Sequence, residues 1–146
     1  MPAYGECRVA EIDAPPQACF DALTDYERLP EWQRAVKHAR VVEHAAGHDV
    51  VEYEVDAKLT TLKYRLKQCY EEPALIDSEY VAGAFRSMSG RWTFEPRPGG
   101  RTLAAVEISV DPGRWVPGPV KKAIEDALLK RALEDLRDRV EDRSGG

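Results

Sequence analysis

Long apolar runs and a secretory leader are both missing from this sequence of 146 residues. No stretch approaches the roughly 20 consecutive apolar residues that a membrane-spanning helix needs. The amino-terminal segment MPAYGECRVAEID also lacks the basic start and apolar core of a signal peptide. The three cysteines are an odd number at wide spacings, with no CxxC motif. We therefore expect reduced thiols, a cytoplasmic location and no stable membrane insertion.

Concentrated positive charge and familiar catalytic motifs are absent as well. The 21 basic residues are outnumbered by 26 acidic ones, which gives a net charge of −5 and argues against nucleic-acid binding. The chain has no glycine-rich phosphate loop and no nucleophile elbow. His44 and His48 are spaced for metal binding only on a helix, whereas they flank an Ala-Ala-Gly turn. We expect no metal site and no cofactor, and we assign no catalytic residue.

Hydrophobic periodicity predicts the order of helices and strands. Residues 6–13 have the pattern of a first strand, and Pro15 and Pro16 then suit the start of a helix over 16–24. Apolar residues at every third position suggest a second short helical turn, broken near Pro30. From residue 36 to 110 the period becomes two, which is typical of strands with one buried face. The predicted strands lie near 36–44, 49–59, 61–71, 75–82, 85–95 and 101–111.

The carboxyl-terminal region is predicted to be a long helix that ends near Asp142, with 143–146 as a frayed tail. Its wide apolar stripe, which includes Leu128, indicates burial along the whole helix. Because the connections between strands are too short for helical crossovers, the sheet should be antiparallel. The expected fold class is α+β, in a single domain over residues 1–146. A curved seven-stranded sheet, two short helices after its first strand and a terminal helix over a cavity make up the helix-grip fold.

Large aromatic residues are predicted on the inner face of this sheet. Period-two parity places Trp92 and Phe94 there, and it makes Tyr53 and Tyr64 neighbours on adjacent strands. Aromatic walls with polar tips suit an apolar ligand, whereas ordinary core packing is the alternative for each residue. The candidate ligand-binding residues are Tyr53, Tyr64, Tyr80, Trp92, Phe94 and Leu128.

The segment DYERLPEW, residues 25–32, places large apolar side chains in the connection after the first helix. Tyr26, Leu29 and Trp32 repeat every three residues, so they share one side of a short helical turn. These three residues are candidates for the mouth of the cavity, where they would form a lid. The alternative is a structural corner that anchors the short helices.

Three stretches resemble one known family: DAPPQACFDALTDYERLPEW, SGRWTFEPRPGGRT and VDPGRWVPGPVKKAIEDALLKRALEDLRDRVE. Together with the strand-rich middle, they resemble the polyketide cyclase/dehydrase and coenzyme-Q-binding-like branch of the START-related (SRPBCC) superfamily. The resemblance extends from about Glu6 to Glu141. It implies a helix-grip domain with a hydrophobic cavity between the sheet and the terminal helix. Members of the superfamily bind lipids, quinones or polyketides, and some catalyse aromatic cyclisation or dehydration.

Three functions follow from these observations. The first is the binding of a small hydrophobic molecule, such as a lipid, a quinone or a polyketide-like compound, in the cavity. The second is a polyketide aromatase/cyclase or dehydratase, for which Tyr53, Tyr64 and His38 are the acid–base candidates. The third is a protein-interaction module, because the resemblance includes ribosome-associated toxins. The sequence leaves the oligomeric state open.

Overall fold

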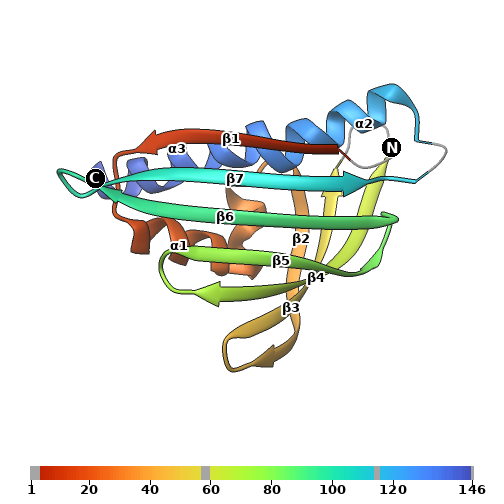
Figure 1. Ribbon diagram of the computed structural model, residues 1–146, viewed down its shortest axis with the longest axis horizontal. Helices are drawn as coiled ribbons and strands as arrows, with labels where there is room; N and C mark the ends of the chain where they lie inside the picture. Colours follow the sequence, from red (N-terminus) through yellow and green to blue (C-terminus); the bar gives the residue numbers. More distant parts are fainter. Residues whose placement is uncertain (1–3, 57–59, 114–115, 146) are drawn as a thin grey trace.

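The computed structural model describes residues 4–56, 60–113 and 116–145, whose arrangement is shown in Figure 1. The amino-terminal elements are β1 (Tyr4–Ile12), α1 (Pro16–Thr24) and the 3-10 helix η1 (Tyr26–Glu31). The other strands are β2 (Val36–Ala45), β3 (His48–Asp56), β4 (Thr61–Glu71), β5 (Leu75–Gly83), β6 (Ser87–Arg97) and β7 (Arg101–Asp111). The carboxyl-terminal helix consists of α2 (Gly118–Glu125), the π-helical turn η2 (Asp126–Lys130) and α3 (Arg131–Gly145).

The strands form one antiparallel sheet in the order β1-β7-β6-β5-β4-β3-β2. Strands β2 to β7 follow one another as hairpins, whereas β1 pairs with β7 at the far edge. Because β1 and β2 form opposite edges, α1 and η1 connect one edge of the sheet to the other. The prediction of a curved seven-stranded antiparallel sheet is confirmed. Strand β6 lies two residues later than predicted at both ends, at Ser87–Arg97 instead of 85–95.

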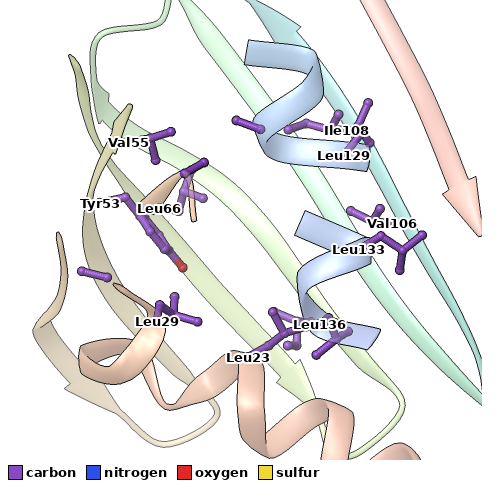
Figure 2. Packing of buried hydrophobic residues seen from close by; sticks show 14 of the residues in the cluster. Leu23, Leu29, Tyr53, Val55, Leu66, Val106, Ile108, Leu129, Leu133 and Leu136 are labelled. Carbon is purple, nitrogen blue, oxygen red and sulfur yellow. The ribbon is translucent and has the colours of Figure 1, made fainter. Parts of the chain in front are cut away.

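The helices pack against one face of the sheet, and the core lies between these two layers. In Figure 1 the carboxyl-terminal helix runs behind β1 and β7, and α1 lies behind the sheet near β5. Alternate residues of β7 point into the core, which is why Ala104, Val106 and Ile108 are buried. The labelled residues on the helical side of the core in Figure 2 are Leu23, Leu29, Leu129, Leu133 and Leu136, all buried.

Helix α1 begins at the predicted pair of prolines. Pro16 occupies the first helical turn, where its missing N–H leaves no hydrogen bond unmade, and the Ala18 N–H donates to the Pro15 carbonyl at 3.0 Å. Its buried residues are Cys19, Phe20 and Leu23, as the helical spacing predicts. The second helical turn is also present, as η1. The prediction of two short helices instead of one long helix is confirmed.

A buried carboxylate fastens the connection after η1 to the carboxyl-terminal helix. Asp135 accepts hydrogen bonds from the Arg34 backbone N–H and from Arg34 Nε, both at 2.9 Å. Next to it, Gln33 is buried and donates from Nε2 to the Ala132 carbonyl at 3.1 Å. Both contacts join residues about one hundred positions apart in sequence. They fix the helix over the open side of the sheet, next to the segment that follows η1.

Strand β1 carries charge on its inner face, where it lies beside the carboxyl-terminal helix. The register pairs Glu6 with Ile108, which points inward, and Glu6 Oε2 lies 3.2 Å from Arg8 Nη2. Burial raises the pKa of Glu125, and the nearby Glu6 carboxyl raises it further, while Arg8 acts in the opposite direction. Asp126 also faces this group and raises the same pKa. Inward charge of this kind discourages pairing of an edge strand with another chain.

The carboxyl-terminal helix differs from the prediction at two points. Its middle contains the π-helical turn η2, which the periodicity did not predict. Helix α3 extends to Gly145, three residues beyond the predicted end at Asp142. Residue 146 of the predicted frayed tail and residues 57–59 of the predicted strand 49–59 lie outside the described residues.

Candidate ligand-binding cavity

A cavity of about 100 Å³ lies between the inner face of the sheet and the helices. Its apolar lining comes from α1 and η1 through Leu23 and Leu29, and from the sheet through Val55, Leu66 and Val106. Ala127, Leu128 and Ala132 of the carboxyl-terminal helix complete it. Because one enclosed water needs roughly 10–15 Å³ of such volume, the space admits a group of waters or a small organic molecule.

A chain of buried polar side chains crosses the floor of the cavity. Ser78 Oγ donates to Gln68 Oε1, and Gln68 Nε2 donates to the Tyr53 hydroxyl oxygen at 2.7 Å. Ser78, Gln68 and Tyr53 are each at most 8% exposed, and all three line the cavity. These bonds occupy the amide of Gln68 on both sides and use the Tyr53 oxygen as an acceptor. The Tyr53 hydroxyl proton is left to point elsewhere.

Tyr53 and Tyr64 stack on each other against the cavity. They occupy directly paired positions of β3 and β4, and their ring centroids are 5.4 Å apart with an interplanar angle of 23°. In Figure 2 the Tyr53 hydroxyl oxygen points away from β3 toward the middle of the cluster. Burial raises the pKa of both phenols above its ordinary value. Both hydroxyls therefore stay protonated at neutral pH and can donate hydrogen bonds.

The structure brings four of the predicted ligand-binding residues together at the cavity, namely Tyr53, Tyr64, Trp92 and Leu128. Phe94 is not among the lining residues, because it lies deeper in the core at 2% exposure and stacks on Trp92 with ring centroids 6.2 Å apart. Tyr80 is also outside the lining. Its hydroxyl donates to the Phe85 carbonyl at 2.7 Å and accepts from the Phe85 N–H at 3.1 Å.

The predicted mouth residues are placed differently from one another. Leu29 lines the cavity. Tyr26 is buried beside it, but its hydroxyl bonds the Tyr70 hydroxyl at 2.7 Å instead of facing the cavity. Trp32 follows η1 and packs half-buried against the core, and its ring lies 6.0 Å from the guanidinium carbon of Arg139. Tyr26 and Trp32 thus have the contacts of a structural corner, and only Leu29 lies where a lid residue would.

Sequence reasoning missed the polar residues of the site. Gln68 occupies an inward position of β4 between Leu66 and Tyr70, and Ser78 occupies the equivalent inward position of β5. The signal that could have found them is parity, because a Gln or Ser at a buried position of an alternating strand needs a polar partner inside the protein. Gln33, which also lines the cavity, follows η1 and has no periodic signal.

No charged side chain among the described lining residues has its charge inside the cavity. Arg91 and Glu107 border it through positions on the outer side of β6 and β7. Arg91 is exposed, and its Nε lies 3.5 Å from Asp77 Oδ1 on that side. The described part of the chain has no group of three or more His, Cys, Asp or Glu side chains placed to bind a metal ion. None of the described helices is long and apolar enough to cross a membrane.

The comparisons with known proteins agree with this architecture. The family model described as "Polyketide cyclase / dehydrase and lipid transport" matches residues 12–137. The chain belongs to this family. No curated protein matches the chain. Among solved structures, the Zhui aromatase/cyclase from a Streptomyces species superimposes with a TM-score of 0.82 at 15% identity, covering 97% of this chain and 96% of that one.

Two further solved structures have the same fold as this chain. A START superfamily protein from Mycobacterium smegmatis has a TM-score of 0.82 at 22% identity, covering 95% of this chain and 98% of that one. A STAR-related lipid transfer protein from Xanthomonas axonopodis has a TM-score of 0.79 at 14% identity, covering 95% and 86%. At these identities the likeness establishes the fold, which is the START-like helix-grip fold that the sequence predicts.

Proposed function

We propose that this protein binds a small hydrophobic molecule in the cavity between its sheet and its carboxyl-terminal helix. The observation that carries the proposal is the cavity itself, which is mainly apolar and contains a few convergent polar groups. Such a combination is typical of small-molecule sites, since apolar walls supply affinity and polar groups fix orientation. The family includes lipid transport proteins by its own description, and one similar structure is a lipid transfer protein.

The second candidate is a polyketide aromatase/cyclase, and the name of the Zhui structure favours it. Cyclisation requires a group that removes or supplies a proton next to the bound substrate. Apart from Arg91 and Glu107, whose charges lie on the outer side of the sheet, the described lining residues supply only neutral hydroxyls, amides and an indole N–H for this purpose. The raised pKa of Tyr53 and of Tyr64 disfavours the phenolate that a general base would need. His38, the third acid–base candidate, is exposed on β2. We therefore prefer binding to catalysis.

Filling the cavity tests the proposal. Gly90 lines the cavity, and a Cβ built on it would meet no atom closer than 3.5 Å, so a larger side chain at this position would extend into the open space. We expect Gly90→Leu to abolish the rise in melting temperature that hydrophobic ligands cause in the native protein. Ser89→Leu is the matched control, because Ser89 precedes Gly90 on the same strand and is exposed on the opposite face.

The readout is a panel of lipids, quinones and aromatic ketones in a thermal-shift assay, with native mass spectrometry of the protein as purified. Ligands that stabilise the native protein and the Ser89→Leu variant but not the Gly90→Leu variant support the proposal. A panel that leaves the native protein unchanged, together with no co-purified small molecule, would count against a binding function.

The proposal also covers location and partners. Cys7, Cys19 and Cys69 are unpaired in the structure, which supports a reducing compartment such as the cytoplasm. The acidic net charge supports a small-molecule ligand in preference to nucleic acid. A protein partner stays a prediction. A pull-down with the native protein would test it, and the same pull-down with the Gly90→Leu variant would show whether a filled cavity changes partner binding.

A further inference from the structure

Three polar groups that face the cavity have a hydrogen-bond donor that no described residue accepts: the Tyr64 hydroxyl, the Tyr53 hydroxyl and the Trp92 indole. The Tyr64 side chain is 3% exposed and lines the cavity, yet its hydroxyl makes no hydrogen bond with any described residue. Among the described residues, Glu6 Oε2 is the only fully covered side-chain oxygen or nitrogen without a hydrogen-bond partner, although it forms the ion pair with Arg8. The Tyr64 hydroxyl is therefore not covered by protein, and since this residue lines the cavity, its hydroxyl borders that space.

Two further donors lie along the same cavity. The Tyr53 oxygen already accepts from Gln68, so only its proton is left for a guest. The Trp92 indole nitrogen, which can only donate, makes no hydrogen bond with the described residues around it. In the ligand-free protein only enclosed water can accept from these donors, and an acceptor on a ligand would replace that water. The unused acceptors of the described lining are Gln33 Oε1 and the Tyr64 oxygen itself, so the three donors outnumber them. The lining therefore favours a ligand that accepts hydrogen bonds, such as a carbonyl compound.

The same lining excludes a charged ligand. As described above, no cation or anion of the described lining residues reaches the cavity. An ionised carboxylate or phosphate placed there would lose its hydration without gaining a counter-charge, which is strongly unfavourable. The uncharged lining therefore favours an uncharged carbonyl compound over a fatty acid or a phospholipid, whose charged groups would have to stay outside the cavity.

The cavity also limits the size of a fully enclosed guest. At roughly 10–15 Å³ per enclosed water, a volume of about 100 Å³ holds about seven to ten waters, which would occupy about 200–300 Å³ as liquid. A bicyclic molecule fits this space, whereas a long acyl chain does not. The stacked pair Tyr53–Tyr64, with ring centroids 5.4 Å apart, and the indole of Trp92 offer flat surfaces to such a ring system.

We propose that the ligand is an uncharged bicyclic carbonyl compound whose carbonyl oxygen accepts a hydrogen bond from the Tyr64 hydroxyl. This inference rests on the proposed binding function and narrows it to one chemical class. Tyr64 is then the residue that sets specificity, and Tyr53 and Trp92 are the neighbouring donors that a second oxygen of the ligand would meet.

Three probes of nearly equal size test the inference: α-tetralone, tetralin and tetralin carboxylate. Tetralin has the ring system of α-tetralone without the carbonyl, and the carboxylate adds a full charge. Dissociation constants are measured by isothermal titration calorimetry at neutral pH. A neutral hydrogen bond gives roughly a three- to tenfold preference, so we expect α-tetralone to bind tighter than tetralin by about that factor. We expect no measurable binding of the carboxylate.

Tyr64→Phe should remove this preference, so that α-tetralone and tetralin bind the variant equally. Its matched control is Tyr80→Phe, which deletes the same oxygen from a tyrosine whose hydroxyl bonds the Phe85 backbone outside the cavity. We expect the control to keep the full preference. Circular dichroism and the melting temperature verify that both variants are folded.

The outcomes separate this inference from the binding function. Three results would overturn the ligand class and leave a hydrophobic binding site standing. They are equal affinity of the native protein for α-tetralone and tetralin, a preference for α-tetralone that survives Tyr64→Phe, and tight binding of the carboxylate. If none of the probes binds and the native protein responds to the ligand panel no differently from the Gly90→Leu variant, the binding function itself fails, and this inference fails with it.

Discussion

Removing the Tyr53 hydroxyl should destabilise the protein, although the substitution changes a single oxygen atom. Tyr53→Phe deletes the acceptor of the Gln68 Nε2 hydrogen bond, which is 2.7 Å long and lies in a region where Gln68 is 6% exposed. A lost hydrogen bond that leaves one buried partner unsatisfied costs about 1–3 kcal/mol. Because Gln68 lines a cavity that admits water, a water can replace part of the bond. We therefore expect a loss of about 1–2 kcal/mol.

The measurement is urea unfolding followed by circular dichroism, with Tyr64→Phe as the comparison. Tyr64 is the stacked neighbour of Tyr53 and equally buried, but its hydroxyl bonds no described residue. We expect Tyr64→Phe to leave the free energy of unfolding unchanged or slightly raised, because it removes a buried polar group without a partner. Combining Tyr53→Phe with Gln68→Leu should cost less than the sum of the single changes, since both delete the same bond. Equal losses in the two single tyrosine variants would refute the reasoning.

Three other predictions concern the backbone, the edge of the sheet and the core. Gly83→Ala should destabilise the protein by about 1–3 kcal/mol or more, because Gly83 has φ +134° and an added Cβ would lie 2.4 Å from the Tyr64 Cα. Chemical denaturation measures this loss of unfolding free energy. Burial raises the pKa of Glu125 from 4.5, so the folded state binds the Glu125 proton more tightly than the unfolded state. The protonated Glu125 therefore contributes stability below pH 4.5, and this contribution is lost as pH rises through the raised pKa. Glu125→Gln should flatten that part of a plot of unfolding free energy against pH, and an unchanged slope would contradict this. Leu136→Ala, at a site with 0% exposure, should cost about 2–5 kcal/mol, visible as a lower urea midpoint.

The sheet could be predicted from the sequence because each strand alternates between a wet and a dry face. The pairing of Tyr53 with Tyr64 followed from parity and a short connection, and the register confirms it. The same parity placed Phe94 correctly on the inner face. It could not tell whether an inward aromatic ring borders open space or fills the core, because that depends on the position of the helix above it.

The π-helical turn has a physical reason in the sequence that periodicity analysis did not use. Val120, Ile124 and Ala127 form an apolar stripe, and regular α-helical spacing would continue it to the charged residues Arg131 and Asp138. One extra residue in the turn η2 shifts the register, so that the buried residues after it include Leu133, Leu136 and Val140. The wide apolar stripe predicted from the sequence is therefore one face of the helix, which continues across the π-helical turn.

The position of β1 at the edge next to β7 affects how the chain can fold. Ile12 pairs with Thr102 and Tyr4 with Val110, so the first described strand pairs with the last one. Until that pairing forms, its backbone N–H and C=O groups have no neighbour, and closing so long a loop slows the search. The inward charges Glu6 and Arg8 therefore protect this strand during the interval before β7 can pair with it.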